Sequence, residues 1–372
     1  MVLPERIKQA RELAGMSKTE LAERLGVTVS AVSQWETNSK HPTIDNELSL
    51  SKALDVPMMF FSNAIPAESL HRGPITFRAR SSARTMILKR QAQRFSEIVS
   101  ELFIWLEKHI AFPAPILPEV SASNPEDAAT QCRRSWGLGD LPITKLGELL
   151  ESKGIRLCTA SFGNIRFDAY SCSFSGRPFI FLGTEKQDRA RSRFDAAHEL
   201  GHLLLHQTLS DDELLSNYQK IESEANEFAG AFLMPAETFS RDVMDTTLEG
   251  FKRLKPRWGV AIQAMVHRAR DLKLITQETY ERHFRNMSAY GWRRAKAEPL
   301  DEIIPTVNRS LGKKSLALLC TNKNFKPWEL PSELPLPESI FVSVFDTDAK
   351  TFMFDEQNKV IAINDFLVQR KA

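Results

Sequence analysis

Apolar positions recur at helical spacing through the N-terminal part of the chain. Residues 4–61 form four or five short helical patterns with brief turns between them, which predicts one small all-helical unit. Polar and proline-containing sequence begins near Ser62. A second apolar stripe, from Ser81 to about Ile110, predicts a long amphipathic helix that the proline-rich residues 112–118 end. We interpret that helix as a connector between domains.

The periodicity changes in the middle of the chain. Residues 125–153 predict two helices, and segments of alternating apolar residues then predict strands at 154–160, 167–174 and 178–183. The Ser-Gly-Arg turn at 175–177 makes the last two strands a hairpin.

Apolar residues recur at helical spacing again after residue 188, and this pattern weakens towards the C-terminus. Residues 188–286 are predicted to be helical, and the pattern weakens after Pro299. Residues 327–337 are interpreted as a proline-rich linker and residues 341–363 as a terminal β-hairpin.

Composition narrows the class of protein. A chain of 372 residues suits two or three domains. The formal net charge is only +2, so affinity for nucleic acid must come from local patches. The four cysteines have no CxxC spacing, which argues against a disulfide framework and a thiolate zinc site. No apolar run approaches the roughly 18 residues of a membrane span, and Glu5 and Arg6 precede any signal-peptide core. We expect a soluble, cytoplasmic protein with no membrane partner.

The N-terminal unit has the pattern of a helix-turn-helix. Its apolar residues can close one small core: Ile7, Ala10, Leu13, Leu21, Ala22, Leu25, Val32 and Trp35. Ser17 and Thr28 are good N-caps, and Glu20 completes a capping box behind Ser17. Gly26 ends the second helix, so the helix from Thr28 to Glu36 is the one offered to the major groove of DNA.

This segment resembles the Xre or λ-repressor-like DNA-binding family. The resemblance implies that Val29, Ser30 and Ser33 face base edges, with Thr28 on the same DNA-binding surface. It also implies polar residues near phosphates, namely Lys18, Gln34, Asn38 and Lys40. Val29 and Ser30 replace longer polar groups that are common in the family, which favours thymine-methyl contact and single hydrogen bonds over bidentate readout. We expect a homodimer on DNA; a helical bundle used only for protein docking is the alternative.

A run of basic residues follows. No acidic residue lies between His71 and Ser96, and the cations there are Arg72, Arg78, Arg80, Arg84, Lys89, Arg90 and Arg94. Runs of this kind are usually solvated faces. The functional alternative is an added stripe of phosphate contacts beside the helix-turn-helix.

The clearest chemical motif is HExxH, present as His198-Glu199-Leu200-Gly201-His202. Residues four apart on a helix lie about 40° apart around its axis, so both imidazoles can reach one ion and Glu199 projects beside them. Zinc held in this way polarises water and a carbonyl oxygen, and Glu199 is placed as general base. Manganese is the second metal that we consider. Histidines that only satisfy hydrogen bonds inside the core are the alternative.

A catalytic zinc site needs a third protein ligand. His206 is excluded because it lies about 12 Å from His198 on a continuous helix. Residues 221–235 predict a helix ended by proline, and Glu222 on it follows His202 by 20 residues, the spacing found in thermolysin-like enzymes. We therefore assign Glu222 as the third ligand, with Glu224 as the alternative.

Further roles around the metal are assigned more loosely. Asn226 and Asp195 can each hydrogen-bond a ligand imidazole. Tyr170, Tyr218 and Arg193 are possible donors to an oxyanion, and the sequence does not choose among them. In a thermolysin-like arrangement the edge strand beside the zinc helix receives the substrate backbone, and we expect residues 178–183 to be that strand.

Residues 194–206 and 222–235 resemble the ImmA/IrrE-type metallopeptidase family, and the similarity runs from about Pro125 to Trp292. The resemblance implies cleavage of a repressor protein, often itself Xre-like, that switches on stress or mobile-element genes. An Xre-type domain joined to this peptidase domain is a known combination.

These features predict an α+β, mostly helical chain in four parts. They are an all-α helix-turn-helix domain at 1–66, a linker with the long helix at 67–120, a thermolysin-like minimal metallopeptidase domain with a small sheet at 121–298, and a small β-containing segment at 299–372 that senses a signal or binds a partner.

The predicted function is transcriptional regulation combined with zinc-dependent endopeptidase activity. Its partners are a double-stranded DNA operator and a repressor-type protein that the chain cleaves, or the chain itself. The alternative is a non-catalytic repressor or antitoxin that binds DNA and neutralises a partner toxin through the second domain. A secreted digestive protease is disfavoured by the attached DNA-binding domain.

Overall fold

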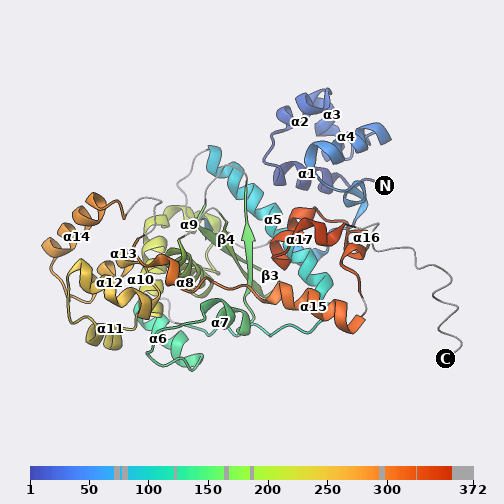
Figure 1. The fold of residues 1–372 in the computed structure, drawn as a ribbon. Helices are drawn as coiled ribbons and strands as arrows, with labels where there is room; N and C mark the ends of the chain where they lie inside the picture. The colour runs from blue at the N-terminus through green and yellow to red at the C-terminus, as the bar shows by residue number, and fades with distance from the viewer. Residues whose placement is uncertain are drawn as a thin grey trace, which may run out of the picture.

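The computed structural model describes residues 1–70, 76–77, 83–120, 124–162, 167–184, 188–292, 298–323 and 325–353. The chain is mostly helical with one small sheet (Figure 1), so the predicted fold class is confirmed. None of the helices described is both long and apolar enough to cross a membrane.

The N-terminal domain is built from short helices, as expected. They are α1 (Pro4–Leu13), α2 (Lys18–Leu25), α3 (Val29–Glu36) and α4 (Ile44–Leu54), followed by the 3-10 turns η1 (Met58–Ser62) and η2 (Ala67–Ser69). Ser17 and Glu20 form the predicted capping box at the start of α2, and Gly26 ends α2 with a φ of 67°. Ile7, Leu21 and Val32 are fully buried in the predicted core.

The sheet has the strand order β1-β3-β4-β2. Its strands are β1 (Thr76–Phe77), β2 (Arg156–Ala160), β3 (Ala169–Phe174) and β4 (Arg177–Gly183). The predicted hairpin is confirmed: β3 and β4 pair antiparallel, and the turn between them has positive φ at Ser175 and Gly176, as a tight hairpin turn requires. However, β4 also pairs in parallel with β2. The prediction that residues 178–183 form an edge strand is therefore wrong.

Alternate residues of the strands face two different cores, as the period of two requires. Tyr170, Phe179 and Phe181 lie on the face that packs against α5 (Ala83–Glu107), where the rings of Phe95 and Phe181 are 5.9 Å apart. The opposite face packs against α8 (Arg189–Leu205) and contributes Ala169, Ile180 and Leu182 to a second core.

Helix α5 joins the N-terminal domain to the sheet by packing as well as by sequence (Figure 1). Arg6 on α1 donates from both terminal nitrogens to the Glu101 carboxylate, at 2.8 and 2.7 Å, and both side chains are buried. Arg94 on α5 pairs with Glu12 of α1 and with Glu97. Arg94 of the basic run therefore serves this interface within the chain.

Two other members of the basic run are described on α5. Lys89 is half-buried and Arg90 is exposed on α5. Arg72, Arg78 and Arg80 lie outside the described residues, as does the side chain of Arg84. The additional phosphate contacts stay a prediction.

The second core is enclosed by helices on the far side of the sheet. Besides α8 they are α6 (Pro125–Ser135), α7 (Leu146–Ser152), α10 (Tyr218–Leu233), α11 (Ala236–Asp242), α12 (Leu248–Trp258), α13 (Ile262–Asp271) and α14 (Gln277–Ala289). The short helix α9 (Asp211–Ser216) contacts α10. The two helices predicted within residues 125–153 are present.

The C-terminal segment differs from the prediction. It contains η3 (Asp301–Ile303), α15 (Leu311–Lys323), η4 (Pro327–Glu329), α16 (Leu330–Glu333), α17 (Glu338–Phe345) and η5 (Ala349–Phe352). The β-hairpin expected at 341–363 is wrong for residues 341–352, and the remainder from residue 354 lies outside the described residues. The physical reason is that Phe341, Val344 and Phe345 bury one helical face, which a short apolar run does not distinguish from a strand.

Candidate metal centre and DNA-binding surface

The start of α8 is fixed by carboxylates. Asp188 caps the helix by accepting from the Arg191 amide at 2.9 Å. Asp301 accepts from the amides of Arg189 and Ala190, at 2.6 and 3.1 Å. Acceptors at a helix N-terminus satisfy amides that have no partner within the helix. Asp188 therefore stabilises the first turn locally, and Asp301 holds the start of α8 against the C-terminal segment.

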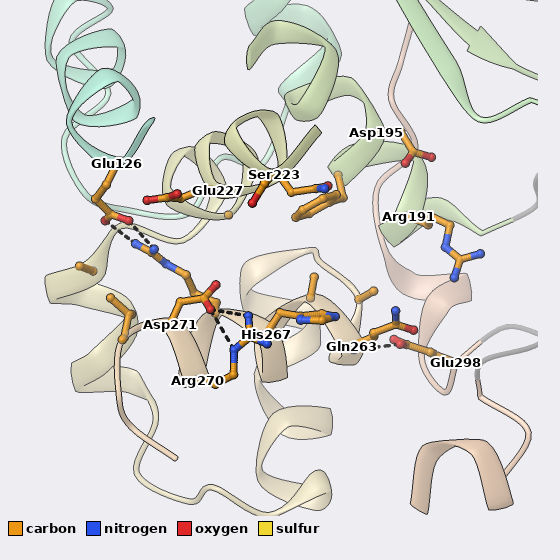
Figure 2. A pocket seen from close by; sticks show the side chains of 18 of the residues that line it. Glu126, Arg191, Asp195, Ser223, Glu227, Gln263, His267, Arg270, Asp271 and Glu298 are labelled. Carbon is orange, nitrogen blue, oxygen red and sulfur yellow. Dashed lines mark hydrogen bonds and ion pairs between the residues drawn. The ribbon is translucent and has the colours of Figure 1, made fainter. Parts of the chain in front are cut away.

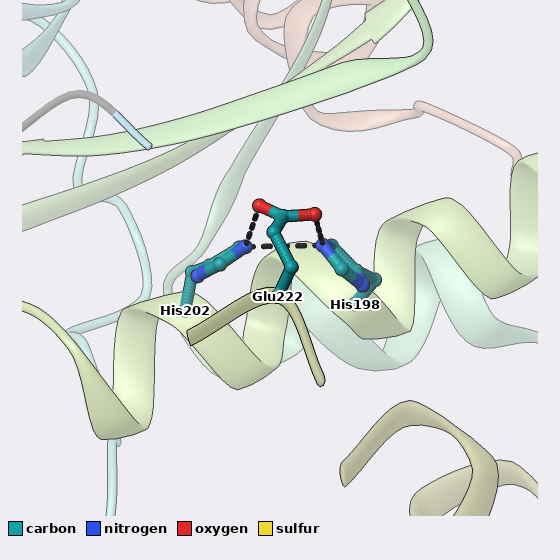
Figure 3. A group of neighbouring side chains, drawn as sticks. All are labelled: His198, His202 and Glu222. Carbon is teal, nitrogen blue, oxygen red and sulfur yellow. Dashed lines mark hydrogen bonds and ion pairs between the residues drawn. The ribbon is translucent and has the colours of Figure 1, made fainter. Parts of the chain in front are cut away.

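Small residues bring α8 and α10 close together. A Cβ added at Gly201 would lie 3.0 Å from the Phe228 ring, which is tighter than most contacts at an ordinary side chain. Ala225 and Ala229 on α10 are fully buried at the same interface. This approach lets the Glu222 side chain of α10 reach the histidines of α8 (Figure 3).

The structure brings together the three residues that the sequence assigned as ligands. The Nε2 atoms of His198 and His202 are 3.0 Å apart. The Glu222 carboxylate oxygens lie 3.6 Å from His198 Nε2 and 3.5 Å from His202 Nε2. All three ligand atoms lie within 4.8 Å of one another, as Figure 3 shows.

The outer nitrogens of both imidazoles have their own partners. His198 Nδ1 lies 3.1 Å from Asn226 Oδ1, and His202 Nδ1 lies 2.9 Å from His206 Nδ1. If each Nδ1 carries the proton, each Nε2 turns a lone pair toward the other and toward a carboxylate. Three converging electron-pair donors call for a cation, and two imidazoles with one carboxylate form a donor set typical of catalytic zinc. The residues therefore fit the metal.

The electrostatics of the metal-free site favour an ionised Glu222. Burial alone would raise the pKa of the Glu222 carboxyl, but hydrogen bonding and charge from His198 and His202 outweigh it and hold that pKa well below its ordinary range. Glu222 is therefore ionised and ready to bind a cation at neutral pH.

Glu224 and His206 occupy a separate position. The Glu224 carboxylate lies 3.1 Å from His206 Nε2. Glu224 therefore contacts His206, whereas Glu222 is the carboxylate that faces the Nε2 atoms of His198 and His202. His206 is the C-cap residue of α8. Burial, with the charge of His202, lowers the pKa of His206 to about 4 despite the opposing effect of Glu224.

Glu199 is buried beside the two histidines. Its Oε2 accepts a hydrogen bond of 2.7 Å from Ser171 Oγ on β3. Sequence reasoning missed Ser171. The signal was present, because Ser171 shares the α8-facing side of β3 with Ala169, where a buried hydroxyl needs a partner.

The remaining predicted residues divide into two groups. Tyr170 and Arg193 point elsewhere, so they are wrong as oxyanion donors: the Tyr170 hydroxyl lies 3.1 Å from Ser96 Oγ on α5, and Arg193 donates to backbone carbonyls of Gly259, Thr144 and Ile143. Tyr218 lies one turn before Glu222 on α10 and stays a prediction. Asp195 is buried, and its role also stays a prediction.

A cavity of about 1060 Å³ lies beside the centre (Figure 2). Asp195, Asn226 and His267 of α13 form part of its wall. The His198, His202 and Glu222 side chains are not among its lining residues, so the cavity touches the outer side of the centre.

The predicted DNA-binding residues lie around α3. Thr28 caps this helix, and Val29 and Ser30 are exposed at its first turn. Ser33 accepts a hydrogen bond of 3.0 Å from Lys18 Nζ, which also lies 3.5 Å from Glu36. Part of the Lys18 charge is therefore compensated within the domain.

The other predicted phosphate contacts are accessible. Gln34 is half-buried, while Asn38 and Lys40 are exposed just beyond α3. Helix α1 packs against α5, and α2 and α3 lie on the outer side of the domain (Figure 1). The surface of α3 is thus available to a partner.

Comparison with known proteins agrees with both halves of this description. Residues 150–270 match the family described as IrrE N-terminal-like domain, and residues 7–61 match the helix-turn-helix family. The chain is 31% identical over 77 residues to proteins named uncharacterized HTH-type transcriptional regulator from Sinorhizobium medicae (strain WSM419) and Rhizobium meliloti (strain 1021). These matches cover 21% of this chain, and the chain spans about half, 55%, of the length of these curated relatives. The chain thus combines an N-terminal helix-turn-helix domain of the Xre-like type with a metallopeptidase-family domain of the IrrE type.

Proposed function

We propose that this chain is a DNA-binding transcriptional regulator whose second domain hydrolyses peptide bonds with a zinc ion held by His198, His202 and Glu222. The observation that carries the proposal is the convergence of these three ligand atoms within 4.8 Å, with Glu199 on the same helix. Manganese suits the same site less well, because two of the three donors are imidazoles.

Each residue of the centre has a distinct task in this proposal. When bound, zinc supplies Lewis-acid chemistry that makes water more acidic and polarises a carbonyl oxygen. Glu199 acts as general base: its carboxylate takes a proton from water and returns it to the amine that leaves. Ser171 orients that carboxylate through the hydrogen bond of 2.7 Å. Tyr218 is the remaining candidate donor to the oxyanion.

The substrate is proposed to be a repressor-type protein, or the chain itself, in a stress or mobile-element response. A peptide strand added beside Glu199 would pair with β3. In the described residues that edge is paired with β1, through Thr76 opposite Ser171 and Phe77 opposite Tyr170. A substrate strand at the same register must therefore displace β1.

The test of hydrolysis compares the parent with Glu199→Gln. Both proteins are incubated with zinc and a candidate repressor from the same genome, and the products of the repressor and of the chain itself are followed by mass spectrometry. The parent should cut one of them and the variant should not. An exposed glutamate on α11, Glu237, supplies the matched control as Glu237→Gln. Cleavage by Glu199→Gln at the parental rate refutes the role of Glu199.

The test of DNA binding uses α3. Replacement of Ser30 and Ser33 by glutamate places negative charge where the helix meets the groove, so a mobility shift with operator DNA should be lost. Ser49→Glu, at an exposed position of α4, is the matched control. A shift that persists unchanged with both α3 substitutions rules out α3 as the recognition helix.

In a second candidate function, the chain binds DNA but does not hydrolyse peptide bonds. The curated relatives carry regulator names alone, which favours a role in regulation without turnover. In this alternative the chain is a repressor or antitoxin, and its second domain neutralises a partner toxin. Gene regulation by Glu199→Gln equal to that of the parent, together with no cleavage by either protein, would support this alternative.

A further inference from the structure

We propose that Glu224 and His206 form a hydrogen-bonded relay that fixes the tautomer and orientation of His202, and so acts as a positioning device for the metal ligand. The inference deepens the proposed function, because it rests on the same metal site. Its evidence is two contacts outside the ligand cluster: His202 Nδ1 to His206 Nδ1 at 2.9 Å, and His206 Nε2 to Glu224 Oε2 at 3.1 Å.

The direction of each hydrogen bond follows from the acceptor at the end of the chain. The carboxylate oxygen of Glu224 accepts, so His206 donates from Nε2. A neutral His206 then has its lone pair on Nδ1, where it accepts from His202. His202 must therefore carry its proton on Nδ1. In the neutral imidazole that binds a metal, the remaining nitrogen, Nε2, keeps its lone pair and faces His198 and Glu222.

The two ligand histidines are thus held by different means. His198 donates to a single amide, Asn226, on α10. His202 is held through a second imidazole that ends on a carboxylate of the same helix, two residues after the ligand Glu222. Since α10 supplies Asn226, Glu222 and Glu224, this helix supplies one ligand, the outer contact of His198 and the carboxylate at the end of the relay. The outer contact of His202 is His206, at the end of α8. Outer contacts of this type set ligand orientation and raise ligand basicity.

Burial makes the relay difficult to replace by solvent. His202 and His206 are 3% and 2% exposed, so water cannot readily supply an acceptor to His202 Nδ1. The outer end, Glu224, is 23% exposed and also lies 3.7 Å from Lys220. The relay therefore runs from the surface to the buried ligand.

The first experiment measures zinc affinity by competition with a chromophoric chelator, which needs no turnover. His206→Leu removes the acceptor for His202 and should weaken zinc binding about 10- to 100-fold. His206→Asn keeps an acceptor oxygen near the position of Nδ1 and should restore most of the affinity. Equal losses in both variants, or no loss in His206→Leu, would overturn the relay.

Two controls separate positioning from general stability. His283 is also buried and lies 2.8 Å from a backbone oxygen, that of Thr246, through Nε2, so His283→Leu should lower thermal stability and leave zinc affinity unchanged. Glu224→Leu should weaken zinc binding in the same direction as His206→Leu. Its exposed neighbour on α10 supplies the matched control, Glu227→Leu, which should not.

The second experiment reads the tautomer directly in the metal-free parent protein. Nitrogen-15 spectra of labelled histidine, assigned by the His202→Asn variant, should show His202 protonated on Nδ1. Protonation on Nε2 alone would overturn the relay even if His206→Leu fails to fold. If the parent protein cannot bind zinc at all, the proposed metal function fails, whereas this spectrum still tests the relay.

Discussion

The buried pair of Arg6 and Glu101 should dominate the attachment of the helix-turn-helix domain to α5. Arg6 makes two bonds to the Glu101 carboxylate and donates to the carbonyls of Asn63 and Ala64, at 2.7 and 3.1 Å. The two side chains are 0% and 1% exposed. Arg6→Met removes every one of these donors and leaves a buried carboxylate without its cation.

The expected cost is about 3–5 kcal/mol, the range for removing one partner of a buried ion pair. At 1.4 kcal/mol per factor of ten, amide hydrogens of α1 should exchange about two to three and a half orders of magnitude faster. Hydrogen exchange followed by mass spectrometry measures this region by region, which suits a chain of several domains. Arg24→Met, at an exposed position of α2, is the control and should change little.

The loss should also depend on pH with a defined sign. Burial already raises the pKa of Glu101, and Arg6 opposes that rise. Without Arg6 the folded-state pKa rises further above the unfolded-state value. Such a group loses stability as pH rises above its unfolded value, so Arg6→Met should be less stable at pH 8 than at pH 5 relative to the parent.

A double variant completes the test. Arg6→Met with Glu101→Leu replaces both charges by apolar groups, and should recover most of the stability that Arg6→Met loses. The reasoning is refuted if Arg6→Met accelerates exchange less than tenfold, or if the double variant is as unstable as the sum of the two single changes.

Three further predictions concern the other elements. Glu222→Ala should lose stoichiometric zinc in elemental analysis, and retained zinc would show that another residue is the third ligand. Ser17→Ala removes the cap of α2 and should destabilise the N-terminal domain by about 1 kcal/mol in urea denaturation; an unchanged midpoint would contradict the role of the capping box. Glu107 is partly buried, which raises its pKa, but Arg177 and Arg156 outweigh burial and lower the pKa. Its contribution to stability is therefore fully present above the unfolded-state pKa, about 4.3, and is lost as pH falls through the lower folded-state pKa. Glu107→Gln should therefore flatten the decline of melting temperature in acid, and an identical decline in both proteins would speak against it.

Local sequence patterns were sufficient to predict the features that depend on residues close together in the chain. The capping box at Ser17 and Glu20, the turn at Ser175 and Gly176, and the pair His198 and His202 each depend on residues within a few positions of one another. Glu222 was identified as a ligand candidate because its spacing from His202 matched thermolysin-like enzymes.

Features that depend on contacts between distant segments could not be predicted from the sequence. Strand order is not encoded in a single strand, so the inner position of β4 was missed. The apolar run at 341–345 fits either periodicity, and its helical state depends on contacts made through Phe341 and Val344. His206 was set aside as a ligand on helical geometry, but its link to Glu224 requires knowing how α10 lies against α8.

Strand β3 connects the helix that carries the N-terminal domain to the candidate metal centre. Tyr170 reaches across to Ser96 on α5, the helix on which the DNA-binding half rests, and the very next residue, Ser171, holds the general-base candidate Glu199. Neighbouring residues of a strand project to opposite faces, so a tilt of α5 that moves the β3 backbone reaches Glu199 through one peptide unit. A displacement of the N-terminal helices that tilts α5 would therefore be transmitted through β3 to the candidate metal centre.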